Sequence, residues 1–180
     1  KLLLQTHKFF GSIEDCYAGR RGIEIAALLE KELSNHANIK IFTETTVAAI
    51  YKDKKAGLFI KNQNYAIVAF RGLIISAGAR EKSLIFNGNH LPGVFGAGAF
   101  QTLVNRDLVQ AGRRVFIVGS GNVGLIAAYH ALQAGITVVA ICDILGKVSG
   151  YKVHADKIKR MGVPIYLKHT VIAAEGNGKV

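Results

Sequence analysis

Three glycines, Gly119, Gly121 and Gly124, stand at a spacing that suits the binding of a diphosphate. They follow the apolar run at 115–118 and open a helical pattern at 123–134. In such a unit the first glycine permits a tight turn, the second lets backbone N–H groups approach a pyrophosphate, and the third allows close packing of helix on strand. The helix N-terminus also favours an anion. The predicted dinucleotide site is formed by Gly119, Ser120, Gly121, Asn122, Val123 and Gly124.

The elements that must position this turn alternate between strand and helix. Apolar runs at 115–118, 136–142 and 163–168 are separated by helical patterns at 123–134 and 154–161. Such alternation predicts an α/β fold with a parallel sheet. Two further elements are predicted in this half, a short helix at 99–109 and a strand at 170–174.

The first half of the chain has a different pattern. A helix is predicted over residues 22–34, and from residue 38 the apolar residues recur with period two or in short runs. Polar turns separate several of these runs, which predicts an antiparallel β-meander. The glycine-rich stretch at 87–98 is interpreted as an interdomain connection. The predicted strands lie at 39–43, 46–51, 58–61, 65–70 and 73–76.

The composition is that of a globular chain, because half of its 180 residues are hydrophobic. No apolar run approaches the roughly 18 residues of a membrane span, so we expect a cytoplasmic protein that does not enter a membrane. The net charge of +11 is divided between residues 1–97, at +5, and residues 98–180, at +6. This even spread favours a solvated surface over a nucleic-acid interface.

The cysteine and histidine patterns argue against two kinds of site. Cys16 and Cys142 are far apart, so the chain lacks a C-x-x-C pair, and its six histidines include no pair at metal-ligand spacing. We therefore expect neither a metal site nor a closely spaced redox disulfide. No side chain is singled out as a general acid or base, and the catalytic residues stay unassigned.

Three segments carry motifs that occur together in one superfamily. Residues 73–81, LIISAGARE, are similar to the strand and A-T-G-A motif that closes an FAD domain. Residues 91–106, LPGVFGAGAFQTLVNR, are similar to a connector in the α-subunits of opine, hydroxyproline and sarcosine oxidases or dehydrogenases. Residues 112–124, GRRVFIVGSGNVG, continue the match. Nearly the whole chain thus resembles the FAD-dependent pyridine nucleotide-disulfide oxidoreductases, flavoproteins with two dinucleotide-binding domains.

This resemblance implies a partial FAD-binding domain in residues 1–97 and an incomplete, Rossmann-like NAD(P)-binding domain in residues 98–180. In the family a hydride passes between NAD(P)H and a flavin, and the redox chemistry is that of the cofactors. The family's first G-x-G-x-x-G and its C-terminal motif are missing here, so we expect a central fragment that binds FAD poorly and is inactive in isolation. The residues implied at the rim of an FAD site are Thr46, Val47, Ser76, Ala77 and Gly78.

The residue that would contact the adenosine ribose is ambiguous. Many family members carry an acid at the end of the second strand, but counting 23 residues from Gly119 leads to Cys142, and Asp143 comes one later. Adjacent strand residues point to opposite faces. Either a one-residue offset turns Asp143 towards the ribose, or Cys142 lies there. No arginine follows the strand and Lys147 is the nearest cation, which favours NADH over NADPH.

Two hypotheses about function follow. The first is an FAD-dependent oxidoreductase that uses NAD(P)H and a small-molecule substrate or electron acceptor. The second is a non-catalytic nucleotide-binding or assembly subunit of an amine- or opine-oxidase complex. Other oxidase subunits or a second copy of the chain are the expected protein partners. The missing C-x-x-C means that disulfide reductase activity is not implied by the superfamily name.

Overall fold

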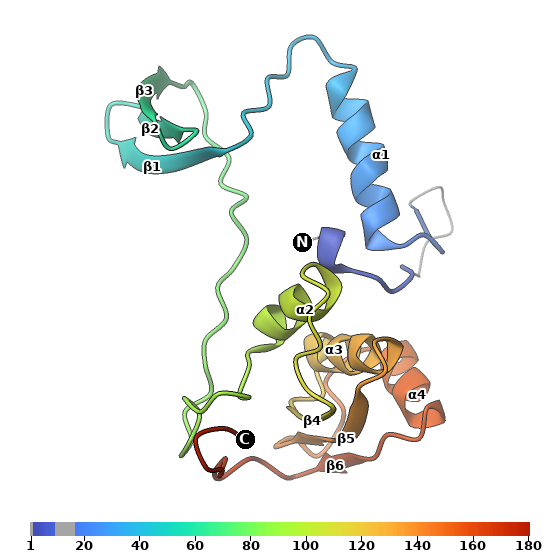
Figure 1. Ribbon diagram of the computed structural model, residues 1–180. Coiled ribbons are helices and arrows are strands. Elements are labelled where there is room, and N and C mark those ends of the chain that lie inside the picture. The colour runs from blue at the N-terminus through green and yellow to red at the C-terminus, as the bar shows by residue number, and fades with distance from the viewer. Residues whose placement is uncertain (1, 10–16) are drawn as a thin grey trace. The chain divides into compact units, whose positions relative to one another are not determined.

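The computed structural model describes residues 2–9 and 17–180, which form two compact units (Figure 1). One unit consists of residues 29–79, and the other combines the described residues up to 28 with residues 80–180. This division differs from the predicted boundary at residue 97, because residues 80–97 bond to the second half of the chain. Glu81 accepts hydrogen bonds from the N–H groups of Ala97 and Gly98. The predicted domain assignment stays a prediction, and Cys16 lies outside the described residues.

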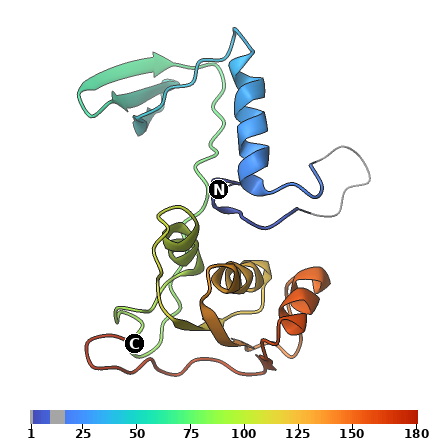
Figure 2. The same cartoon turned by 45° about the vertical axis from the view of Figure 1, so that its right-hand side comes forward.

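The larger unit contains a parallel sheet with strand order β4-β5-β6. Figure 2 shows helices α3 and α4 on one side of this sheet. This arrangement confirms the predicted Rossmann-like α/β class. The bounds of the five elements are β4 Arg114–Val118, α3 Asn122–Gln133, β5 Thr137–Asp143, α4 Lys152–Arg160 and β6 Ile165–Leu167.

The core of this unit lies between the helices and the sheet. Leu125 and Ala128 of α3 are fully buried there, with Ile141 of β5 and Ile158 of α4. Small residues along α3 let it approach the strands closely. The helix ends at Gln133 and is followed by Gly135, whose φ of +74° suits glycine and reverses the chain into β5.

Helix α2, Ala97–Asn105, packs beside α3 and precedes the sheet. It ends four residues earlier than predicted, because the chain after Asn105 turns away with Leu108 at a φ of +54°. A single 3₁₀ turn, η1, covers Leu2–Leu4 and contacts α2. The N-terminal segment therefore packs on α2 within the larger unit.

The smaller unit contains an antiparallel meander of β1 Thr45–Tyr51, β2 Lys55–Ile60 and β3 Asn64–Ala69. Helix α1, Gly22–Ser34, has the predicted bounds and runs from one unit into the other. The strands predicted at 39–43 and 73–76 are wrong, and the one at 170–174 is reduced to one bridge between Asn87 and Ala173. An apolar run becomes a strand only where a neighbouring strand pairs with it.

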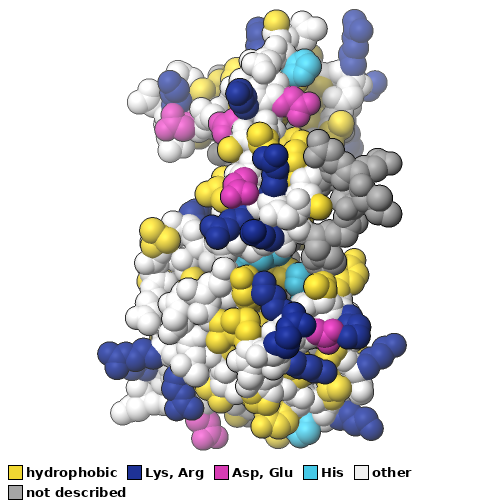
Figure 3. Space-filling view, turned by 90° about the vertical axis from the view of Figure 1, so that its right-hand side faces the viewer, with side chains coloured by type: hydrophobic (Ala, Val, Ile, Leu, Met, Phe, Trp, Pro, Cys, Tyr) yellow, Lys and Arg dark blue, Asp and Glu magenta, His cyan; other side chains and the backbone are white. Residues whose placement is uncertain are grey.

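Charged side chains are distributed over both units. On the face shown in Figure 3, Lys and Arg are interleaved with hydrophobic side chains. Among the described residues the longest helix, α1, has 13 residues, and none is long and apolar enough to cross a membrane.

Candidate dinucleotide site

The glycine turn between β4 and α3 has the geometry that its spacing predicts. Gly119 has a φ of +106°, a conformation that favours glycine, and its N–H donates to the carbonyl of Cys142 at 2.7 Å. A Cβ on Gly124 would lie 2.0 Å from the carbonyl oxygen of Gly119. The turn therefore folds back onto the first turn of α3 so closely that only glycine fits at 124.

Gly121 leaves open space in front of the helix. It is the N-cap of α3, with φ −68° and ψ 171°, and no side chain caps the helix. A Cβ at this position would meet only Ser149 Oγ, at 3.7 Å, which is an ordinary contact. Glycine is thus not required here by the fold itself. An uncapped helix N-terminus with room in front of it is suited to an anion.

A β-bulge determines which residue at the end of β5 faces this turn. Val115 pairs with Val138 but Phe116 pairs with Ala140, so Val139 is an extra residue in β5. The insertion reverses the alternation, and both Val138 and Ile141 face the helices in the core. Asp143 consequently lies on the helix side. The structure thus has the one-residue offset that the sequence left open, and the contact of Asp143 with an adenosine ribose stays a prediction.

The Asp143 carboxylate is buried against the glycine turn, with 6% of the residue exposed. Its Oδ2 accepts hydrogen bonds from the Ser120 N–H at 2.7 Å and the Ser120 hydroxyl at 2.5 Å. Its Oδ1 accepts one from the Leu145 N–H at 2.9 Å. Burial opposes ionisation, but the hydrogen bonds from Ser120 and Leu145 outweigh it and lower the pKa of Asp143 below its usual value. The residue is therefore a carboxylate at neutral pH.

The other candidate, Cys142, is placed elsewhere. It pairs with Val118 and Tyr166 in the middle of the sheet, and 2% of the residue is exposed. Burial, followed by the charge of Asp143, raises the pKa of its thiol. These observations fit a small core residue that is protonated at neutral pH.

The loop predicted at 146–150 bonds to the glycine turn, a contact that sequence reasoning missed. Gly150 donates its N–H to the Ser120 carbonyl at 2.9 Å, and the Tyr151 N–H donates to Asn122 Oδ1 at 2.6 Å. A Cβ on Gly150 would lie 2.9 Å from the Asn122 nitrogen. The Ser149-Gly150 pair was a usable signal, since it reads as a turn. The contact of this loop with the glycine turn, 30 residues earlier, could not be predicted from the spacing of residues in the sequence.

The residues predicted at the rim of an FAD site lie in the smaller unit. Thr46 and Val47 are on β1, whereas Ser76, Ala77 and Gly78 are in the irregular chain after β3. All five are exposed. Their contribution to FAD binding stays a prediction.

Known proteins resemble this chain in sequence and in fold. The α-subunit of sarcosine oxidase from Rhizobium meliloti (strain 1021) is 30% identical over 139 residues, which are 69% of this chain and 14% of that protein. A probable ferredoxin reductase from Castellaniella defragrans is 29% identical over 128 residues, or 69% of this chain and 30% of that protein. The chain thus spans less than a third of either relative.

A solved thioredoxin reductase from T. acidophilum has a similar fold. The TM-score is 0.65 at 23% sequence identity, and the match covers 89% of this chain and 50% of that one. The sequence model described as pyridine nucleotide-disulphide oxidoreductase matches residues 18–180. The chain therefore belongs to the pyridine nucleotide-disulphide oxidoreductase family.

Proposed function

We propose that this chain supplies the nicotinamide-dinucleotide site of an FAD-dependent oxidoreductase that passes a hydride between NAD(P)H and a flavin. The observation that carries this is the uncapped N-terminus of α3, with open space at Gly121 and a turn that is hydrogen-bonded to Asp143. Backbone N–H groups at the start of α3 would hold the pyrophosphate. When bound, the nicotinamide supplies the hydride.

Asp143 positions the turn and selects the nucleotide. By accepting from both polar hydrogens of Ser120 it fixes the residue between the two glycines of the turn. Its ionised carboxylate lies at the end of β5, where a nearby 2′-phosphate would meet a like charge. Lys147 in the following loop is exposed and no arginine lies beside it in sequence. We therefore expect NADH to bind more tightly than NADPH.

FAD would contact the chain only through exposed residues, and we expect the isolated chain to bind it weakly. Thr46, Val47 and the segment 76–78 would form that rim. The electron acceptor would be a small molecule or another subunit, and we place the protein in the cytoplasm. The similarity to a protein named as the α-subunit of an oxidase favours a second candidate, a nucleotide-binding subunit without activity of its own.

The proposal is tested by titrating the chain with NADH and following nucleotide fluorescence. We expect a Kd between about 1 μM and 1 mM. Gly121→Val should abolish binding without unfolding the protein, because its Cβ meets only Ser149 at 3.7 Å. Gly72→Val is a matched control, since a Cβ at Gly72 meets nothing within 4 Å. A folded wild-type chain that binds no NADH would contradict the proposal.

A second assay separates the two candidates. NADH oxidation is measured with a dye acceptor and with FAD at millimolar concentration, so that the weak binding of FAD does not limit the rate. An oxidoreductase gives a rate that Gly121→Val removes. A nucleotide-binding subunit binds NADH in the titration and gives no rate.

A further inference from the structure

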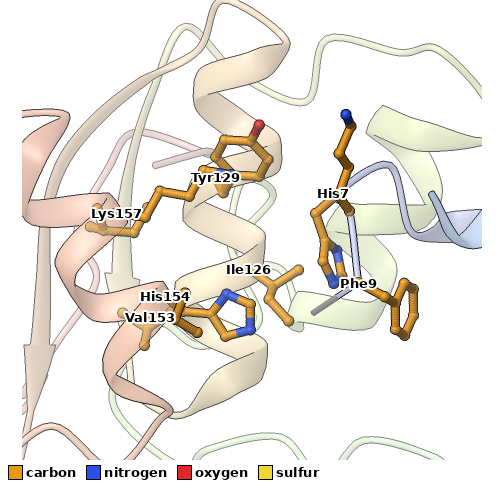
Figure 4. Close-up of a pocket in the computed structure, with 10 residues that line it drawn as sticks. His7, Phe9, Ile126, Tyr129, Val153, His154 and Lys157 are labelled. Carbon is orange, nitrogen blue, oxygen red and sulfur yellow. The ribbon is translucent and has the colours of Figure 1, made fainter. Parts of the chain in front are cut away.

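Three histidines gather where the N-terminal segment meets α3 and α4. Figure 4 shows two of them, His7 and His154, beside a cavity. The ring of His7 lies 5.6 Å from that of His130 and 5.8 Å from that of His154, and it stacks on Phe9 at 5.2 Å. His7 is 8% exposed and His130 is 1% exposed. Beside them is a cavity of about 170 Å³ lined by both helices and the segment. The histidine cluster of His7, His130 and His154 is therefore an internal contact of the larger unit.

Two side-chain hydrogen bonds hold residues 2–9 on α2 and α3. Asn105 of α2 donates from Nδ2 to the Leu4 carbonyl at 2.7 Å. Thr6 donates from its hydroxyl to Gln133 Oε1 of α3 at 3.1 Å. The ring of His7 adds the only imidazole contact that the described segment makes with α3 and α4. Backbone hydrogen bonds also join the segment to residues 19–22, among them the Phe9 N–H to the Arg20 carbonyl at 2.9 Å. The contacts with α2, α3 and α4 are therefore the ones on which the cluster can act.

The Asn105 amide links this anchor to the protonation of His130. Asn105 Nδ2 also lies 2.9 Å from His130 Nδ1, so one amide nitrogen serves the Leu4 carbonyl and the ring. An amide nitrogen can only donate, which means that His130 Nδ1 accepts and carries no proton. A protonated His130 would carry a hydrogen on Nδ1. This N–H would face the N–H of the Asn105 amide, and the hydrogen bond between them would be lost. Turning the amide over would relieve that conflict but would leave the Leu4 carbonyl facing an oxygen.

The described residues that line the cavity beside the cluster supply no negative charge. Titratable groups face it from the segment (Lys8), from α3 (Tyr129) and from α4 (Lys157), while α2 contributes the neutral Asn105. The Lys157 ammonium lies 3.4 Å from the centre of the Tyr129 ring. Neither Asp nor Glu is among the described residues that line the cavity. A proton on His130 is therefore opposed by the charge of Lys157, and the described lining offers no carboxylate to neutralise it.

We propose that the histidine cluster is a pH-controlled latch, in which protonation releases residues 2–9 from α2, α3 and α4. At neutral pH the rings are uncharged, Asn105 bridges Leu4 and His130, and the segment is docked. On acidification the charged rings repel one another and Lys157, and the Asn105 bridge is broken. Release uncovers the outer face of α3 and α4 and frees the start of α1, which is bonded to the segment through Gly22 and Gln5.

The sign of the pH dependence follows from the docked state. Burial, then His7 and Lys157, lower the pKa of His130 from 6.5 to about 4. Burial also lowers the pKa of His7 and His154. A released histidine binds its proton more readily, so docking is strongest above pH 6.5 and weakens as the pH falls towards 4. For His130 alone the docking equilibrium constant falls by at most about 30-fold between pH 8 and pH 5, the limit in which the released ring regains its ordinary pKa of 6.5.

Hydrogen exchange of the 180-residue chain at pH 8 and pH 5 tests the latch, with rates expressed relative to the intrinsic rate at each pH. We expect the protection of residues 5–9 to fall tenfold or more at pH 5, while the amides of β5 stay protected. His130→Asn keeps an acceptor for Asn105 but does not titrate, and should lose less than a third as much protection. His90→Asn, an exposed histidine outside the cluster, should behave as the wild type.

Three results would overturn the latch. Protection of residues 5–9 could be equal at the two pH values, or His130→Asn could lose as much as the wild type. Loss of protection in β5 at pH 5 would mean that the whole unit unfolds instead. Asn105→Ala provides a check that does not depend on His130, because it should lower the protection of residues 5–9 equally at both pH values. Full protection in that variant would contradict the role given to Asn105.

Discussion

A side chain would have equally little space at Gly124 in the glycine turn and at Gly57 in the β-meander, but the neighbouring atoms that limit the space are different. A Cβ on Gly124 would lie 2.0 Å from the backbone carbonyl of Gly119, and one on Gly57 would lie 1.9 Å from the Tyr65 hydroxyl. The first neighbour is part of a turn held by Asp143, whereas the second is the tip of an exposed side chain that can move. The two regions thus differ in rigidity, and a nucleotide site needs the rigid one.

The surroundings explain this difference. Ser120 is fully buried, and the turn is bonded to β5 and to the loop at 149–151. The meander has Val47, Tyr65 and Ile67 exposed on its strands. Substitutions in the two regions should therefore change the free energy of unfolding by very different amounts.

The largest effect is expected for Gly124→Ala. The methyl group cannot coexist with the Gly119 carbonyl, so the turn or α3 must shift, at a cost of about 3 kcal/mol or more in the free energy of unfolding. NADH binding should be lost as well. Urea denaturation and hydrogen exchange of β4 and β5 measure the change. A variant as stable as the wild type would show that the turn is not rigid.

Asp143→Asn should have the next largest effect and lower the free energy of unfolding by about 2 kcal/mol. An amide has one accepting oxygen, so it cannot accept from both Ser120 and Leu145 as the carboxylate does. The folded-state pKa of Asp143 is lowered, so this stabilisation is present above its unfolded pKa of 3.8 and is lost as the pH falls below that value. Denaturation of both proteins from pH 7 to pH 3 checks this. Curves that stay equally far apart at pH 3 would refute the linkage.

A smaller cost, about 1.5 kcal/mol, is expected for Ser120→Ala. It removes the hydroxyl that lies 2.5 Å from Asp143 but leaves the Ser120 N–H bond in place. Measured with Asp143→Asn in a double-mutant cycle, the two changes should be far from additive. Additive costs would mean that the hydroxyl does not depend on the carboxylate.

The smallest effect is expected for Gly57→Ala, whose free energy of unfolding should lie within about 1 kcal/mol of that of the wild type. The Tyr65 ring can rotate away and gives up only its contact with the Tyr51 hydroxyl, at 2.7 Å. Hydrogen exchange of β2 reports the change. A cost as large as that of Gly124→Ala would remove the contrast between the two regions.

The sequence predicted the glycine turn well because its signals are local. Gly119 and Gly124 have conformational and steric needs that neighbouring residues create. The face occupied by Asp143 could not be predicted, because it depends on the bulge at Val139, which exists only once β4 and β5 are paired. The strands predicted at 39–43 and 73–76 failed for a similar reason, since apolar composition does not supply a partner strand.

The central claim is that the glycine turn, and not the meander, binds the nicotinamide nucleotide. The most direct test is to titrate the ¹⁵N-labelled chain with NADH and to follow its amide chemical shifts. The account predicts large shifts for residues 119–124 and small ones for β1, β2 and β3. Shifts confined to residues 45–78, or none anywhere in a folded sample at millimolar NADH, would contradict it.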